Sequence, residues 1–401
     1  MPWILRTFLT ICLVALPLFL YVGLRIAGSV GLLRPPVKRR ARKVALVLIA
    51  WIYVLPVLAL LLYAFGSLSS LFVFNDSISW ADYMFHYPIW IALIIVLELT
   101  APFLVLDITL LVARLFLSSL QKFRRAFAYV RLVLGTLAIL YVPIRTTIDT
   151  AHVRDSTLRI PIAALPQELD GLQLSLLGDM QIDRYTGDSK ISQVRGIIES
   201  RKPGMLLSAG DMVTSGTTFL GEAAAAIQHL KGTHGNVAVM GDHDFWSAPE
   251  AVRAMYLSDG WTFLDNEHCL SSFAGRSVLV TGLTHIYSNR LKVTDLKSFL
   301  DSAPKADLRI LLVHQPAEQV VRLAADAGYH LVLAGHTHGG QIVLHPLGIA
   351  LTPSMLETKY YEGAYKVGST TVVVTRGVGV TLAPVRYHSG AEVTTLVLAK
   401  N

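Results

Sequence analysis

Acidic and imidazole side chains follow short apolar runs at several places in the second half of this chain. An aspartate closes each of the runs LQLSLLGD, MLLSAGD and NVAVMGD, and these aspartates are 32 and 31 residues apart. Histidines follow two later runs, RILLVHQP and HLVLAGHTHGG. The candidate residues are Asp179, Asp211, Asp242, His314, His336 and His338. Carboxylates and imidazoles together form a ligand set that favours divalent transition ions such as Mn, Fe, Zn or Co.

This number of candidate ligands exceeds what a single ion with an open coordination position requires. It fits two divalent ions that share a bridging carboxylate. A pair of ions at such a site activates a water molecule and holds the oxygens of a phosphoryl group during in-line displacement. The residues by themselves therefore predict hydrolysis of a phosphoester, provided that the fold brings them together.

Strand-like and helix-like segments alternate from about residue 172 onward, and these elements must position the ligands. Runs such as MLLS alternate with helical patterns such as SKISQVRGIIES and AEQVVRLAADAG. The alternation predicts βαβ units and a largely parallel core sheet, where ligands gather beyond the carboxyl ends of the strands. The runs QIVLHP, TTVVVTRG and VTTLVLAK lack intervening helices, which predicts an antiparallel portion or a second sheet.

Five motifs in this order resemble the calcineurin-like metallophosphoesterase superfamily. They are GDMQ (178–181), GDMVT (210–214), GDHD (241–244), VHQP (313–316) and GHTHGGQ (335–341). The resemblance covers about residues 170–395, and the chain is similar to bacterial membrane-associated phosphoesterases with N-terminal transmembrane helices. It implies an α/β metallophosphoesterase fold, a two-sheet mixed β-sandwich flanked by helices, with the dinuclear site at the strand ends.

The resemblance also implies which residues bind the two ions, whose identity we expect to be Mn, Fe or Zn. Asp179 and His338 would bind one ion, and Asp211 would bridge both. His314 and His336 would bind the second ion.

Four further residues of these motifs receive roles from the same resemblance. His243 would act on the leaving oxygen as a general acid or charge stabiliser, and Asp244 would orient it. Gln181 stands where the family has a histidine and Asp242 where it has an asparagine. Gln181 would offer a neutral oxygen ligand or play a structural role. Asp242 would add a third carboxylate. With a hydroxide counted in the site, this lowers the net charge from about +1 to about zero and favours a phosphodiester.

The first 150 residues have the composition of a membrane region. They contain 14 Lys and Arg against 5 Asp and Glu, whereas residues 151–401 contain 21 against 23. The basic pI thus belongs to the first part, and we expect no nucleic-acid partner for the second. Four apolar stretches are long enough to approach a bilayer crossing, at 7–24, 44–65, 88–112 and 127–144. We therefore expect a transmembrane region at 1–150 and a catalytic domain at 151–401.

Basic residues between the stretches predict the orientation of the chain in the membrane. Six Lys and Arg lie between residues 34 and 43 and three between 122 and 125, while 66–87 has none. By the positive-inside rule the basic loops are cytoplasmic. The chain would then be a multi-pass protein of the cell (inner) membrane with its catalytic domain on the extracytoplasmic face. A cleaved signal peptide is the alternative for the first stretch.

Three polar residues interrupt the apolar stretches. Glu98 and Asp107 lie in the third, where helix packing with neutral carboxyls is preferred over an ion pathway. Arg131 lies in the fourth, and we expect it to snorkel.

The preferred hypothesis is a membrane-tethered, metal-dependent phosphoesterase that cleaves a phosphodiester or pyrophosphate bond by metal-activated hydroxide. Its substrate would lie at the membrane surface, for example a lipid headgroup or another lipid-linked phosphate, with membrane lipids as partners and the oligomeric state open. One alternative is a non-catalytic, metal-dependent binding or regulatory protein. Another is a transporter or channel with an accessory domain, for which Glu98 and Asp107 are the only support.

Overall fold

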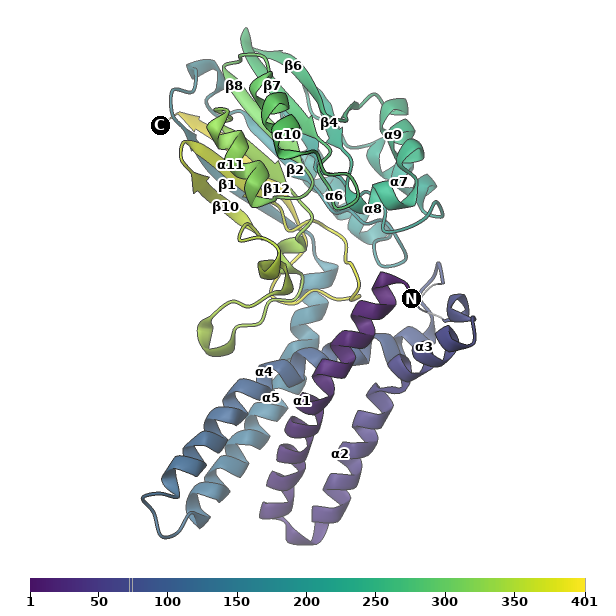
Figure 1. Cartoon of the computed structure of the whole chain (residues 1–401), viewed down its shortest axis with the longest axis vertical. Coiled ribbons are helices and arrows are strands. Elements are labelled where there is room, and N and C mark those ends of the chain that lie inside the picture. The colour runs from purple at the N-terminus through teal and green to yellow at the C-terminus, as the bar shows by residue number, and fades with distance from the viewer. Residues whose placement is uncertain (72, 74, 401) are drawn as a thin grey trace. The chain divides into compact units, whose positions relative to one another are not determined.

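The computed structural model describes residues 1–71, 73 and 75–400 of the chain. The chain divides into two compact units (Figure 1). Unit 1 contains Met1–Ile148, Ile342–Leu351 and Leu382–His388. Unit 2 contains Asp149–Gln341, Thr352–Thr381 and Ser389–Asn401. The expected boundary near residue 150 lies close to the end of the first segment of unit 1, but two later segments also pack in that unit.

Long apolar helices make up most of unit 1. They are α1 (Trp3–Leu33), α2 (Lys38–Ile52), α3 (Val54–Ala64), α4 (Tyr87–Ala113) and α5 (Gln121–Ala151). Short helical turns lie between them at Pro35–Val37, Leu68–Ser70 and Asp82–His86. Among the described residues, four helical segments have the length and composition to cross a membrane: Trp3–Leu33, Pro35–Ala64, Asp82–Ala113 and Gln121–Ala151. Three of the four predicted stretches fall within these segments, and the stretch 44–65 extends one residue beyond Ala64. The loop at 66–87 includes residues 72 and 74, which lie outside the described residues.

A break separates α2 from α3 and divides the second apolar segment. Pro56 lies in the first turn of α3 and has no backbone N–H to donate to the carbonyl of Ile52. The helix therefore stops at Ile52 and restarts at Val54, with Tyr53 between them. The hydroxyl of Tyr53 donates to the carbonyl of Cys12, which ties this break to α1.

Asp107 and Arg131 form an ion pair inside the helical region, contrary to our expectation that Arg131 snorkels. The Asp107 carboxylate lies 2.7 Å from Nε of Arg25 and 2.5 Å from an Arg131 nitrogen, and it accepts a 2.7 Å hydrogen bond from Tyr21. Arg131 is only 7% exposed, so its charge needs a partner within the protein, and the Asp107 carboxylate is that partner. Asp107 thus serves helix packing, as expected, but as a partner of two arginines and not as a neutral carboxyl.

Two six-stranded sheets form the centre of unit 2. The first has the order β1 (Arg154–Ile162), β12 (Glu392–Lys400), β2 (Gln173–Leu177), β3 (Met205–Ser208), β4 (Asn236–Val239) and β5 (Thr262–Leu264). The second has the order β10 (Gly363–Val367), β11 (Thr370–Val374), β9 (Leu331–Ala334), β8 (Leu308–Val313), β7 (Arg276–Leu283) and β6 (Glu267–Phe273). Strands β2 to β5 are parallel, as are β11, β9, β8 and β7, and the antiparallel pairs are β12 with β2, β10 with β11, and β6 with β7.

Helices cover the outer face of each sheet, as Figure 1 shows. They are α6 (Asp188–Arg201), α7 (Leu220–Ile227), α8 (Asp242–Ser247) and α9 (Pro249–Ser258) on the first sheet, and α10 (Val293–Asp301) and α11 (Glu318–Asp326) on the second. Side chains of both sheets, among them Leu176, Leu207 and Leu312, form one buried core between them. The predicted two-sheet mixed sandwich flanked by helices is confirmed.

Candidate dinuclear metal centre

The candidate ligands all follow parallel strands whose carboxyl ends meet at one edge of the sandwich. In the first sheet Asp179 follows β2, Asp211 follows β3 and Asp242 follows β4. In the second sheet His314 follows β8, and His336 and His338 follow the neighbouring β9. Because these strands are adjacent and parallel, each sheet delivers its ligands to the same edge.

Most of these residues have a left-handed backbone, which is rare outside glycine. The positive φ angles are 48° at Asp179, 44° at Gln181, 56° at Asp211, 71° at His336 and 50° at His338. Each such residue costs about 1–3 kcal/mol unless its surroundings hold it, and such residues cluster at functional sites. These strained backbone conformations therefore direct the side chains of the candidate ligands toward one another.

Two glycines of the motifs allow the strand-end loops to approach closely. A Cβ atom at Gly241 would lie 2.0 Å from Oδ1 of Asp211, and one at Gly335 would lie 2.6 Å from Oδ2 of Asp179. Any side chain at either position would therefore displace a ligand carboxylate.

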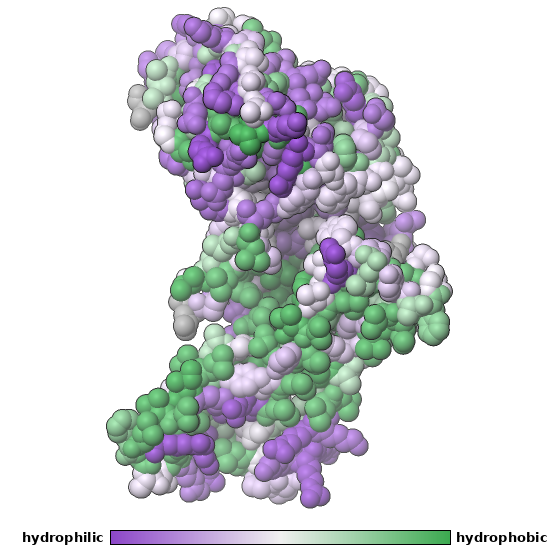
Figure 2. Space-filling view, in the orientation of Figure 1, coloured by the Kyte–Doolittle hydropathy of each residue, from purple (hydrophilic) through white to green (hydrophobic). Residues whose placement is uncertain are grey.

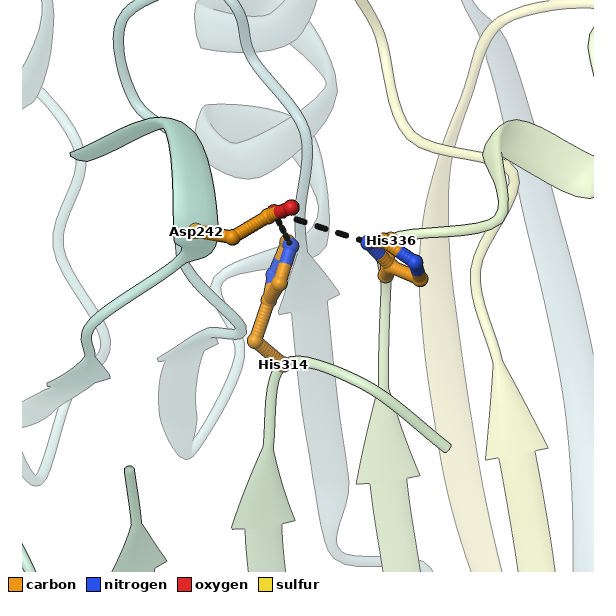
Figure 3. A group of neighbouring side chains, drawn as sticks. All are labelled: Asp242, His314 and His336. Carbon is orange, nitrogen blue, oxygen red and sulfur yellow. Dashed lines mark hydrogen bonds and ion pairs between the residues drawn. The ribbon is translucent and has the colours of Figure 1, made fainter. Parts of the chain in front are cut away.

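Asp242, His314 and His336 form a first group of ligands, shown in Figure 3. Oδ1 of Asp242 lies 2.8 Å from Nε2 of His314 and 3.5 Å from Nδ1 of His336. Nδ1 of the buried His314 lies 2.7 Å from the carbonyl of Ala209, to which it donates. A ligand histidine typically uses its second nitrogen in this way to fix the ring, which leaves Nε2 of His314 directed at the group.

His336 is held by a residue that the sequence analysis did not identify. Its Nε2 lies 3.1 Å and 3.2 Å from the two carboxylate oxygens of Glu357, and the ring of Tyr287 packs against it at 5.5 Å. Nδ1 of His336 therefore remains the nitrogen that faces Asp242. Glu357 and Tyr287 lie outside the five motifs, in segments without a recognisable pattern, so no sequence signal pointed to them.

Asp179 and Asp211 form a second group together with His314. Both oxygens of Asp179 accept the backbone N–H of His336 at 2.9 Å, and Nε2 of His338 lies 3.8 Å from Oδ1 of Asp179. Oδ2 of Asp211 lies 3.3 Å from Nε2 of His314. Asp211 thus lies between Asp179 and the first group, where a bridging ligand is required.

Gln181 is fully buried beside Asp211 and fits a ligand role. Its Nε2 donates to Oδ2 of Asp211 at 3.0 Å. Within the described part of the chain, its Oε1 has no hydrogen-bond partner. A buried amide oxygen without a partner is costly, and a cation beside it would remove that cost.

The residues present fit two divalent ions. Among the described residues, carboxylate and imidazole donors form three overlapping groups, and the ligand atoms of each group lie within 4.8 Å of one another. The third group contains Asp211, Asp242 and His243, so Asp211 belongs to two of the three. Backbone strain, fixed imidazoles and the unpartnered Gln181 oxygen all occur at this one edge. Asp179, Gln181, Asp211, Asp242, His314, His336 and His338 are therefore the residues that would hold the ions.

His243 and Asp244 differ from the expected arrangement, in which Asp244 orients the His243 ring. Nδ1 of His243 lies 2.6 Å from the carbonyl of Thr214, so this carbonyl is the group that orients the ring. The Asp244 carboxylate instead accepts hydrogen bonds from the backbone N–H groups of Asp211, Met212, Val213 and Gly241. Asp244 thus shapes the loop that carries Asp211, while Thr214 is a further residue that sequence reasoning did not identify.

The ligands strongly perturb one another's protonation in the metal-free protein. Burial raises the pKa of Asp179 to about 6, although the nearby charge of His314 opposes this. Burial alone would lower the pKa of His336, but hydrogen bonds to Asp242 and Glu357 raise it to about 9. Burial would likewise raise the pKa of Asp242, yet contacts with His314 and His336 hold it far below its usual range. In the metal-free site, Asp179 and His336 therefore keep their protons to a higher pH than usual, and bound cations would displace these protons.

Arg376 follows β11 in the sequence VTRG, and its side chain is engaged with protein carboxylates. Its guanidinium lies 2.6 Å from Glu362 and 3.1 Å from Glu392. We therefore assign Arg376 no contact with substrate.

Residues 175–340 match the family model described as calcineurin-like phosphoesterase. The two-sheet sandwich and the metal-binding groups at its strand ends agree with this match. This part of the chain is therefore similar to calcineurin-like phosphoesterases, and the predicted resemblance of the five motifs is confirmed.

Several curated proteins are similar to this chain. A zebrafish (Danio rerio) "transmembrane protein with metallophosphoesterase domain" is 31% identical over 60% of this chain and 56% of its own length. The metallophosphoesterase YkuE of Bacillus subtilis is 28% identical over 60% of this chain and 83% of its own. "Phosphodiesterase YaeI" of Escherichia coli is 27% identical over 56% of this chain and 82% of its own. The chain spans just over half the length of the zebrafish protein, and the same holds for a bovine relative of the same name.

Proposed function

We propose that this protein is a membrane-anchored phosphohydrolase with two divalent ions, which cleaves a phosphodiester in preference to a phosphomonoester. The observation that carries the proposal is the convergence of Asp179, Asp211, Asp242, His314 and His336 at one edge of the sandwich. The family match and the name of the E. coli relative support phosphoester cleavage.

When bound, the two ions supply a water molecule activated as a nucleophile and neutralise charge on the phosphoryl oxygens. The protein's own part is to hold the ligands in place and to assist departure of the leaving group. Asp211 lies between the two ligand groups, and its carboxylate is fixed by Gln181 and by the backbone N–H of His243. These two hydrogen bonds fix the orientation of the Asp211 carboxylate between the two ligand groups.

His243 is the residue that we assign to the leaving oxygen. Its Nδ1 is occupied by the Thr214 carbonyl, so Nε2 is the nitrogen left to meet a substrate. The backbone N–H of His243 donates to Oδ1 of Asp211 at 2.9 Å, which holds this side chain beside the bridging ligand. A histidine in this position donates a proton to an alkoxide or phosphate as it departs.

The preference for a phosphodiester follows from the charge of the site. Oδ1 of Asp242 lies among the imidazole ligands, so this carboxylate counts in full toward the charge of the centre. Three carboxylates leave two divalent ions with a net charge of about +1 before nucleophile and substrate enter, whereas two would leave about +2. A lower positive charge weakens the attraction for a doubly charged phosphomonoester more than it weakens the attraction for a singly charged phosphodiester.

The membrane segments support a substrate at a membrane surface, such as a phospholipid headgroup or a lipid-linked phosphate. In unit 1, the segment Ile342–Leu351 presents Ile349 and Leu351, which are 64% and 48% exposed. Exposed aliphatic side chains on a segment that packs with transmembrane helices are favourable in contact with lipid. We also propose that the catalytic domain faces the extracytoplasmic side of the inner membrane.

The activity is tested with the purified full-length protein, stripped of metal and resupplied with Mn, Fe, Zn or Mg. The substrates are a chromogenic phosphodiester, the matching monoester and pyrophosphate. We expect metal-dependent diester cleavage that is absent in Asp211→Asn and retained in His229→Ala, an exposed histidine outside the site. Binding of two ions without cleavage of any substrate would instead favour a metal-dependent binding protein.

The orientation is tested with single cysteines in whole cells. A membrane-impermeant maleimide should label a cysteine at the exposed Glu222 in unit 2 but not one at Arg40 in the basic loop. The reverse pattern would place the domain in the cytoplasm.

A further inference from the structure

Unit 1 contains a cavity of about 350 Å³ that the phosphoesterase activity does not use. The helices α4 and α5 contribute Glu98, Leu137, Ala138, Tyr141 and Val142 to its wall. The two later segments of unit 1 contribute His345, Tyr387 and His388. Its volume is within the range of small-molecule sites, roughly 300–1,000 Å³.

The carboxylate of Glu98 is the most unusual feature of this cavity. Tyr387, which is 1% exposed, forms a hydrogen bond to Glu98. The other oxygen, Oε1, is buried and has no hydrogen-bond partner among the described residues. A carboxylate within a membrane helix normally faces a partner of opposite charge, as Asp107 does with Arg25 and Arg131. Glu98 has no such ion pair in the described structure.

The remaining polar side chains of the cavity wall form hydrogen bonds with one another. Nε2 of His388 lies 2.8 Å from the hydroxyl of Tyr141, and its Nδ1 lies 3.0 Å from Nδ1 of His345. The rings of Tyr387 and His388 stack at 4.1 Å. Glu98 is therefore the single acidic group in a wall that is otherwise aromatic, imidazole and aliphatic. Such a wall attracts a cation that also carries apolar surface.

The cavity lies near the membrane surface opposite the basic loops. Glu98 is 15 residues before the end of α4 at Ala113, roughly 22 Å along the helix. Tyr141 is 20 residues after the start of α5 at Gln121, roughly 30 Å, which is about the thickness of the hydrocarbon core. Leu137 and Tyr141 are 57% and 49% exposed, so this side of the cavity wall is directed to the surroundings of the helices. In Figure 2 the helical part presents a largely hydrophobic surface above a hydrophilic lower end.

We propose that this cavity binds an organic ammonium group, in which Glu98 pairs with the charge and Tyr141 and Tyr387 pack against its carbon atoms. The ammonium is carried by a phospholipid headgroup of the ethanolamine type or by a soluble amine, and the exposed Leu137 and Tyr141 favour the lipid. The site is independent of the proposed phosphoesterase activity.

The test uses the full-length protein in detergent, after delipidation, and native mass spectrometry to measure bound phosphatidylethanolamine. Phosphatidylglycerol serves as the comparison lipid, and free ethanolamine is added as a competitor. We expect selective retention of phosphatidylethanolamine and a loss of about tenfold in affinity in Glu98→Gln. Thr109→Ala, an exposed substitution on the same helix, should bind like the unaltered protein.

Tyr387→Phe separates a binding role of Glu98 from a purely structural one. This variant removes the hydroxyl hydrogen bond but keeps the carboxylate, so ammonium binding should persist within about twofold. If Glu98 only stabilised the helices, both variants would lower the melting temperature and neither would change lipid selectivity. Equal retention of both lipids in all variants overturns the proposal. Displacement by free ethanolamine at low concentration upholds the ammonium site and identifies a soluble amine as its ligand.

Discussion

Nε2 of His314 lies 2.8 Å from Oδ1 of Asp242, although the two residues are 72 positions apart and follow strands of different sheets. This contact places the carboxylate that replaces the expected asparagine among the imidazole ligands. The substitution therefore changes the charge of the metal site and not only the surface beside it.

Asp242→Asn should consequently change both metal binding and substrate preference. It removes one negative charge while keeping the size of the side chain, so we expect metal affinity to fall by about tenfold. The ratio of diester to monoester cleavage should fall as well, because the site becomes more positive. Asp188→Asn, at an exposed position, is the matched control. Unchanged affinity and an unchanged rate ratio would contradict the charge argument.

Gln181→Ala tests the buried amide oxygen that has no partner in the described structure. We expect the variant to bind one ion tightly and to lose much of its affinity for the other, because one oxygen ligand is gone. Metal content after dialysis, measured by mass spectrometry, should fall from about two ions to about one per chain. Gln228→Ala at an exposed position should keep both. Retention of both ions in Gln181→Ala would assign Gln181 a structural role.

His243→Ala should lose activity while retaining metal. Its side chain is held by Thr214. It belongs to a third group with Asp211 and Asp242, but the other two ligand groups do not contain it, so we expect its removal to affect proton transfer to the leaving oxygen more than metal binding. General acid catalysis of this kind contributes about 10²–10⁴-fold to the rate. The loss should be smaller for a substrate with a good leaving group than for an alkyl ester. An equal loss for both substrates, or a loss of metal, would assign His243 a different role.

The metal-free protein should become less stable as the pH rises. The folded-state pKa of His336 is raised from 6.5 to about 9, and that of Asp179 from 3.8 to about 6. The folded state thus binds more protons than the unfolded state, and the stability from His336, present below about pH 6.5, is lost as the pH approaches about 9. Metal affinity should rise over the same interval, because cations compete with these protons.

Thermal unfolding of chelator-treated protein at a series of pH values checks this dependence. The same series with Mn present should show a much smaller decline. Stability of the chelated protein that increases between about pH 6.5 and 9 would contradict the protonation of His336.

Asp107→Asn should destabilise the helical region. The change leaves Arg25 and Arg131 without their carboxylate partner. The Arg131 side chain is 8% exposed, and an uncompensated buried charge costs about 3–5 kcal/mol, whereas the half-exposed Arg25 adds little to this cost. Glu98→Gln removes a carboxylate on the same helix that lacks an ion-pair partner in the described structure, so its effect on stability should be smaller. Melting temperatures of both variants in detergent compare the two directly, and equal effects would argue against the ion-pair network.

Several parts of the site could be predicted because they depend on local sequence. Asp179, Asp211 and Asp242 each follow a short apolar run, and the topology of parallel strands brings such positions to one edge. The transmembrane segments were predictable for a similar reason, since length and apolar composition decide whether a helix can cross a bilayer.

Other contacts could not be predicted because they join segments that are far apart in the chain. Glu357 meets His336 through a loop without regular pattern, and Thr214 orients His243 through a backbone carbonyl, a group that every residue has. The pairing of Arg131 with Asp107 depends on how α4 and α5 pack, and periodicity does not report which faces meet.

The sequence by itself determined the order of strands and helices, the four apolar segments and the identity of most candidate ligands, because these follow from short-range pattern and from motifs. Tertiary structure alone decided the packing of Ile342–Leu351 and Leu382–His388 with the helices, the unpartnered oxygen of Gln181 and the cavity around Glu98. Each of these depends on distances between atoms remote in the chain, which are set by how the whole chain packs.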